Sequence, residues 1–190
     1  MFIQTEQTPN PLTLKFLPGR VVMEDDTIFF KEKSQSQSSP LATRLFSIDG
    51  VLSVFLGKDF ITITKKEETE WQVLKPLLLG AITDHYSSGE EIIIDKKNIK
   101  KEKINESKID DKDEDVVKKI KELLDTRVRP AVALDGGDII FQNFNDGIVY
   151  LHMQGACSGC PSSTATLKMG IENMLKHYVP EVKEVRPVDA

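Results

Sequence analysis

The residues best suited to chemistry in this chain are its two cysteines, which lie together in the sequence Cys157-Ser158-Gly159-Cys160 and are followed at once by Pro161. Proline favours the first position of a helix, so the pair is predicted to occupy a loop between a strand and a helix. The free N–H groups and the dipole of that helix favour a thiolate, the form of cysteine that ligates metals or attacks disulfides. A glycine-containing loop is expected to expose the sulfur atoms. The pattern therefore predicts a reactive or metal-binding pair.

Three kinds of chemistry remain open for this pair. The first is thiol–disulfide exchange, because thioredoxin-type sites also place C-x-x-C between a strand and a helix. Against it, the surrounding domain is small, and its strands are predicted to arrive as a hairpin rather than a βαβ unit. The second is a structural zinc site, which needs four ligands and would have to recruit His85, His152 or His177. The spacing of these histidines from the cysteines is not that of a usual zinc finger.

The third possibility is an iron–sulfur cluster held between two chains. A cubane cluster commonly takes four cysteine thiolates, and one chain supplies two. A two-fold symmetric pair of chains would supply all four. Such a cluster would be exposed and held by one short loop from each subunit, which suits a cluster that is carried and released.

Composition excludes several other classes of function. The chain has 190 residues, and its 30 acidic and 25 basic residues give a net charge of −5, which does not support binding to nucleic acid. No apolar run approaches the roughly 18 residues of a membrane span. The first residues resemble neither a signal peptide nor an Arg-rich transit peptide, so a cytoplasmic protein is expected.

The elements that position the cysteines are predicted to form a carboxy-terminal domain over residues 113–190. A helix with one apolar face is expected to end at Arg129-Pro130, and a tight turn at Asp135-Gly136-Gly137-Asp138 leads into a strand. The turn Asn145-Asp146-Gly147 then predicts a hairpin. A second helix starts at Pro161, and a short strand at residues 182–188 completes an α-β-β-α-β order.

The amino-terminal part, residues 1–92, is predicted to be a second small α+β domain. The pattern indicates a strand at residues 13–17, a Ser/Gln loop at 34–40 that leads into a helix, and a hairpin over residues 51–64. A further helix begins near Trp71 and is expected to kink at Pro76. The densely charged residues 93–112 predict a flexible linker between the two domains. The fold class is thus α+β, with two small domains.

Several longer motifs resemble the NifU-like (Nfu) family of iron–sulfur cluster scaffold and carrier proteins. The cysteine loop with the start of its helix, residues 155–172, is similar to the carboxy-terminal domain of that family, as are Arg129-Pro130 and the following Asp-Gly-Gly-Asp sequence. Residues 8–16, 53–55 and 59–65 resemble the Nfu amino-terminal domain. The resemblance covers nearly everything except the charged linker and the Ser/Gln loop.

This resemblance implies that Cys157 and Cys160 ligate a 4Fe–4S cluster shared across a homodimer. It further implies a non-enzymatic carrier that receives the cluster from upstream assembly proteins and delivers it to apo iron–sulfur client proteins. The domain arrangement is similar to mitochondrial and alphaproteobacterial Nfu proteins. We expect a bacterial cytoplasmic protein, with a processed form in the mitochondrial matrix as the alternative. The amino-terminal domain has no visible catalytic set and is a candidate for recognising client or donor proteins.

Overall fold

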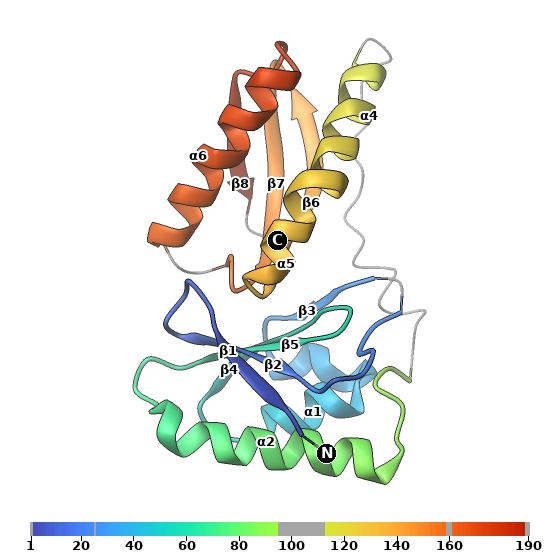
Figure 1. The fold of residues 1–190 in the computed structure, drawn as a ribbon, viewed down its shortest axis with the longest axis vertical. Helices are drawn as coiled ribbons and strands as arrows, with labels where there is room; N and C mark the ends of the chain where they lie inside the picture. Colours follow the sequence, from blue (N-terminus) through green and yellow to red (C-terminus); the bar gives the residue numbers. More distant parts are fainter. Residues whose placement is uncertain (1, 25, 95–112, 159–160, 189–190) are drawn as a thin grey trace. The chain divides into compact units, whose positions relative to one another are not determined.

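The computed structural model describes residues 2–24, 26–94, 113–158 and 161–188, without the side chains of residues 161–163. The chain divides into two compact units, Met1–Lys103 and Ile104–Ala190, and each combines helices with a sheet (Figure 1). This confirms the predicted α+β class. The predicted linker lies, from residue 95 to 112, outside the described residues, so the domain boundaries stay a prediction. None of the helices in the described ranges has the length and apolar character needed to cross a membrane.

The first unit is built on a five-stranded antiparallel sheet in the order β1-β2-β5-β4-β3. Its strands are β1 (Gln4–Gln7), β2 (Thr13–Leu17), β3 (Ile28–Phe30), β4 (Val51–Leu56) and β5 (Ile61–Lys65). Its helices are η1 (Lys33–Ser38), α1 (Pro40–Phe46) and α2 (Trp71–Ser88), and α1 and α2 cover one face of the sheet (Figure 1). Alternate residues of the central strands, such as Leu14, Phe16, Ile61 and Ile63, pack into the core beneath the two helices.

Most local predictions for this unit are confirmed, with one correction. The strand at 13–17, the β4–β5 hairpin and the helix that opens at Pro40 are all present. The predicted Ser/Gln loop is instead largely a 3₁₀ helix, because the Ser36 hydroxyl donates to the Lys33 carbonyl over 2.8 Å and closes a local turn. Pro76 lies inside α2.

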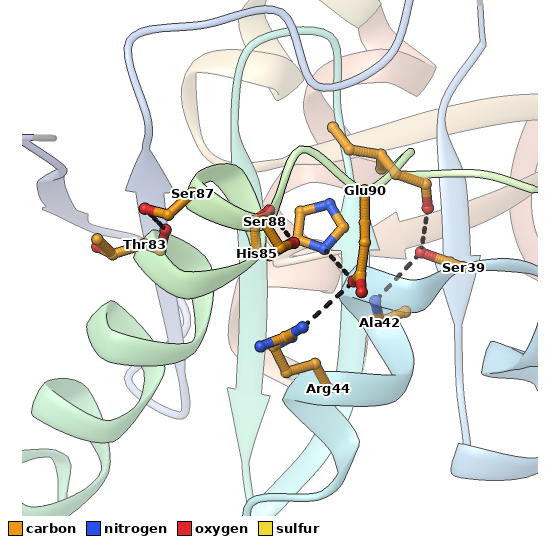
Figure 2. A network of polar contacts seen from close by, with 9 residues as sticks. Ser39, Ala42, Arg44, Thr83, His85, Ser87, Ser88 and Glu90 are labelled. Atoms are coloured by element: carbon orange, nitrogen blue, oxygen red, sulfur yellow. Dashed lines mark hydrogen bonds and ion pairs between the residues drawn. The ribbon is translucent and has the colours of Figure 1, made fainter.

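Residues 89–94, which we call the strap, follow α2 and remain attached to the first unit. Gly89 ends the helix in the left-handed conformation, with φ of 70°. The Glu90 carboxylate then lies 3.2 Å from the Arg44 guanidinium on α1 and 3.7 Å from Nδ1 of His85 on α2 (Figure 2).

Backbone contacts fix the rest of the strap. The Ser39 hydroxyl, which caps α1 by accepting from the Ala42 N–H, donates to the Ile92 carbonyl over 2.7 Å (Figure 2). The Ile94 N–H donates to the Ser38 carbonyl over 2.9 Å. The strap is therefore an ordered part of the amino-terminal core.

The second unit carries a three-stranded sheet in the order β6-β7-β8. Its strands are β6 (Gly137–Asn145), β7 (Ile148–Gly155) and β8 (Glu184–Val188). Its helical segments are α4 (Glu114–Leu123), η3 (Leu124–Val128), α5 (Arg129–Leu134) and α6 (Pro161–Tyr178), which lie on one face of the sheet (Figure 1). The predicted α-β-β-α-β order is confirmed. Asp146 and Gly147 have φ of 51° and 86°, as a type I′ hairpin turn requires.

Two predictions for this unit are wrong. The first helix does not end at Arg129-Pro130 but continues to Leu134, with a π-helical turn at η3 immediately before the proline. Proline is tolerated there because it lies in the first turn of α5, where a backbone N–H is not needed for a hydrogen bond within the helix. The π-helical turn before it also changes the hydrogen-bond pattern. The cysteine loop also belongs to a βαβ unit, because β8 pairs with β7 in parallel and α6 connects them.

Candidate metal-binding site at the cysteine loop

Cys157 lies where the chain leaves β7 and turns toward α6. Gly155 turns the chain with φ of 64°, and the Ala156 N–H donates to the Gly136 carbonyl over 3.1 Å. From the helix side, the Thr164 hydroxyl donates to the Cys157 carbonyl over 3.1 Å. The residue is thus held from both β6 and α6, as the strand-to-helix prediction requires. Cys160 lies outside the described residues.

The Cys157 side chain points inward, which sequence reasoning did not anticipate. Only 5% of the residue is exposed, and it packs within the core of the second unit. A Cβ placed on Gly137 would lie 2.6 Å from Cys157 Sγ and 2.6 Å from the carbonyl oxygen of Gln154. The sulfur therefore occupies space that only a glycine at position 137 leaves open.

Burial also determines the protonation of this thiol. It raises the pKa of Cys157 to about 12, and the negative charges of Asp135 and Asp138 act in the same direction. The expectation of an exposed thiolate is wrong for Cys157, because the side chain is buried and the loss of hydration raises its pKa. In the free chain Cys157 is a protonated, sheltered thiol.

The Asp-Gly-Gly-Asp sequence supports the site without being a set of ligands. Gly136 adopts the left-handed conformation, with φ of 84°, which fits the predicted turn. Gly137, in contrast, is required because a side chain at this position would collide with Cys157 Sγ. The buried Asp138 accepts two hydrogen bonds of 2.8 Å from Arg129 and one of 2.8 Å from the Ile139 N–H. This pairing raises the pKa of Arg129 and ties the start of α5 to the start of β6.

The three histidines considered as zinc ligands lie in different local surroundings. His85 belongs to the first unit, beside the strap. His152 is buried in β7, with Nδ1 3.1 Å from the Val188 carbonyl oxygen, and His177 stacks edge-on against Tyr178 at the end of α6. No group of three or more His, Cys, Asp and Glu side chains is arranged to hold a metal within the described residues, of which Cys160 is not one.

Each of the two units matches a known protein-family model. Residues 3–89 match the model for the scaffold protein Nfu/NifU N terminal domain, and residues 120–186 match that for the NifU-like domain. The chain is 50% identical over 189 residues to the human NFU1 iron-sulfur cluster scaffold homolog, mitochondrial, covering 99% of this chain and 72% of that protein. It belongs to the NifU-like (Nfu) scaffold family.

A plant relative agrees with this assignment. The NifU-like protein 4, mitochondrial, of Arabidopsis thaliana is 51% identical over 187 residues, which cover 97% of this chain. The chain spans 65% of that plant protein, so it is shorter than these Nfu relatives. A solution NMR structure of a NifU-like protein from Saccharomyces cerevisiae is 31% identical, with a TM-score of 0.45 over 49% of this chain and 84% of that one. The family is one of scaffolds, which agrees with the expectation of a non-enzymatic protein.

Two residues near the cysteine loop have roles that their motifs do not indicate. The sequence predicts only a turn at Gly137, although a glycine in a strand also marks a close approach of another part of the chain. It predicts only a helix end at Arg129, whereas the Arg129 guanidinium donates two hydrogen bonds to the buried Asp138. The signal available in the sequence is the occurrence of this arginine and this aspartate within one motif.

Proposed function

We propose that this chain is an iron–sulfur cluster scaffold and carrier in which Cys157 and Cys160 from each of two copies ligate one 4Fe–4S cluster. The observation that carries the proposal is the position of Cys157, at the turn between β7 and α6 in a chain that contains only two cysteines. Four thiolates are the common ligand set of a cubane cluster, so a second copy would complete it. Soft thiolate ligands suit iron in such clusters.

The state of Cys157 in the free chain bears on how a cluster would be loaded. The buried thiol has to turn out of the space above Gly137 and lose its proton before the sulfur binds iron. A protonated, buried thiol also reacts slowly with oxidants, which protects the unloaded scaffold. Release to a client proceeds by exchange of these thiolates for those of a more complete site.

The proposal is tested by anaerobic reconstitution of the full chain with iron and sulfide. We expect a brown dimer with about four irons per pair of chains, as cubane ligation requires. Cys157→Ser and Cys160→Ser should each abolish cluster binding, because each removes a soft thiolate ligand, and the circular dichroism spectrum checks that each variant is folded. A colourless monomer, or a cluster retained by either variant, would rule out the shared site.

Thiol–disulfide exchange remains the second candidate, because β7, α6 and β8 form a parallel βαβ unit around the loop. It predicts a reversible disulfide between Cys157 and Cys160 and reduction of insulin by the monomer. Zinc in place of iron after purification would instead support the structural zinc hypothesis. The same sample, measured for iron, zinc and insulin reduction, separates all three.

The partners and location follow from the same proposal. We propose apo iron–sulfur proteins as clients and upstream assembly proteins as donors, with the first unit as a candidate for recognising them. The human and plant relatives are named as mitochondrial proteins, which favours a mitochondrial location for this chain. The bacterial cytoplasm stays a prediction, tested by locating the native protein in fractionated cells.

A further inference from the structure

The Cys157 side chain can reach a partner outside the core only if the backbone around it moves. The direction of its Cα–Cβ bond is set by the backbone, and the whole residue is only 5% exposed. A change of side-chain rotamer alone therefore turns the sulfur about a Cβ atom that stays buried. The sulfur occupies the space above Gly137, where an added Cβ would lie 2.6 Å from it. Exposure of the thiol requires a change in the turn that carries it.

Hydrogen bonds from both sides hold this turn in place. From the side of β6, the Gly136 carbonyl accepts the Ala156 N–H over 3.1 Å. From the side of α6, the Thr164 hydroxyl donates to the carbonyl of Cys157 itself over 3.1 Å. Because the peptide bond is planar, this second bond fixes the whole peptide group that follows Cys157. It is also a bond that a single substitution can remove, since its donor is a side chain.

The Thr164 bond differs from the usual hydrogen bond of a helical threonine. Within a helix, the threonine hydroxyl commonly donates to the carbonyl four residues before it, as Thr126 does to Glu122 over 2.7 Å. Thr164 lies in the first turn of α6, and its hydroxyl reaches back seven residues instead, to a carbonyl outside the helix. The bond thereby links α6 directly to the turn that carries the cysteine.

We infer that Thr164 is a positioning residue that holds Cys157 in its sheltered position, and that breaking its hydrogen bond is the step that lets the sulfur leave the core. The inference rests on the proposed function for its meaning, because a thiol that ligates iron has to become accessible. Thr164 acts here through the backbone of Cys157 and not as a ligand. One hydrogen bond of this kind shifts an equilibrium between a closed and an open turn by about two- to tenfold.

The test measures alkylation of Cys157 by iodoacetamide in full chains that carry Cys160→Ser, so that one thiol reports. Thr164→Val keeps the branched shape of threonine and removes the hydroxyl, whereas Thr164→Ser keeps the hydroxyl. Thr126→Val is the matched control, because it removes a threonine-to-carbonyl hydrogen bond elsewhere in the same unit. We expect alkylation to be about two- to tenfold faster in Thr164→Val and unchanged in Thr164→Ser and Thr126→Val.

Low urea concentrations, below the unfolding transition, separate opening of the turn from unfolding of the unit. Local opening exposes little surface, so the alkylation rate should hardly depend on urea, whereas a rate that requires global unfolding rises steeply with urea. The inference is overturned if Thr164→Val is alkylated no faster than Thr126→Val, or if its rate depends steeply on urea. Faster alkylation of Thr164→Ser would also overturn it, because the hydroxyl would then not be the cause.

This experiment is independent of iron, which separates the inference from the proposed function. If the chain with both cysteines forms no cluster on anaerobic reconstitution, the proposed function fails, while faster alkylation of Thr164→Val still shows that Thr164 holds Cys157 in place. If the cluster forms and Thr164→Val is alkylated at the control rate, the inference alone fails.

Discussion

His85 in the first unit and Cys157 in the second are both buried side chains for which burial favours the neutral form, and the charges around them differ. Burial lowers the pKa of His85; the Arg44 charge adds to this and the Glu90 charge opposes it. For Cys157, burial and both neighbouring carboxylates act together. Two nearby charges therefore shift the pKa of His85 in opposite directions, whereas burial and both carboxylates all raise the pKa of Cys157. Acid protonates His85 because its pKa lies below the ordinary value of 6.5, whereas the Cys157 thiol, with a pKa of about 12, keeps its proton at neutral pH.

The largest expected effect comes from filling the space under Cys157. Gly137→Ala places a Cβ 2.6 Å from the sulfur and 2.6 Å from a backbone oxygen that cannot move freely, so we expect a loss of about 1–3 kcal/mol in unfolding free energy. The matched control is Gly170→Ala on the exposed face of α6, where nothing lies within 4 Å. There, the better helix propensity of alanine should stabilise the unit by up to about 1 kcal/mol.

Urea denaturation followed by circular dichroism measures this pair of variants. Trp71 is the only tryptophan and lies in the first unit, so its fluorescence should report that unit separately. A destabilisation seen by dichroism and not by fluorescence would assign the effect to the second unit. Equal stability of Gly137→Ala and the unaltered chain would show that the cysteine side chain is not confined by position 137.

The features that the sequence predicted correctly are those set by local signals. Pro40 and Pro161 mark helix starts, and Asp146 with Gly147 marks the hairpin, because each acts on its own few residues. The features that were missed depend on distant partners. β8 pairs with β7 in parallel only after α6 has crossed over, and the burial of Cys157 depends on a glycine in the preceding strand.

The strap illustrates the same limit in the first unit. Nothing in its sequence predicts that the strap is attached to the first unit. Its contacts are made with Ser38, Ser39 and Arg44, which lie far from it in the sequence. From the sequence alone, His85 is therefore interpreted only as a possible zinc ligand. The motifs predict that the cysteines follow a strand and precede a helix, and the tertiary structure determines that the Cys157 side chain is buried there.

A smaller effect is expected from acidification of the first unit. The unfolded chain titrates His85 near the ordinary pKa of 6.5, whereas the folded pKa is lower, so the unfolded state binds the proton first. Stability should be complete above pH 6.5 and fall as the pH drops from there toward the folded pKa. Trp71 fluorescence during urea denaturation at a series of pH values measures the change.

Two variants sharpen this result. His85→Gln removes the titrating ring and should flatten the pH profile, whatever it does to absolute stability. Glu90→Gln removes the charge that favours the imidazolium 3.7 Å away, so the loss of stability at low pH should become steeper. A profile that is already flat in the unaltered chain, or that keeps its slope in His85→Gln, would contradict the assignment.

The smallest expected effect is at Cys157 itself. Asp135 is exposed, and its charge raises the pKa of the Cys157 thiol less than burial does. In a Cys160→Ser background, Asp135→Asn should lower that pKa and modestly increase the rate of alkylation, because only the thiolate reacts. The increase should shrink at high salt, which screens an exposed charge. Asp146→Asn, on the β6–β7 hairpin, is the matched control and should leave the rate unchanged. If Asp135→Asn gave no increase at low salt, the charge of Asp135 would play no part in keeping Cys157 protonated, and burial with the Asp138 charge would remain as the causes.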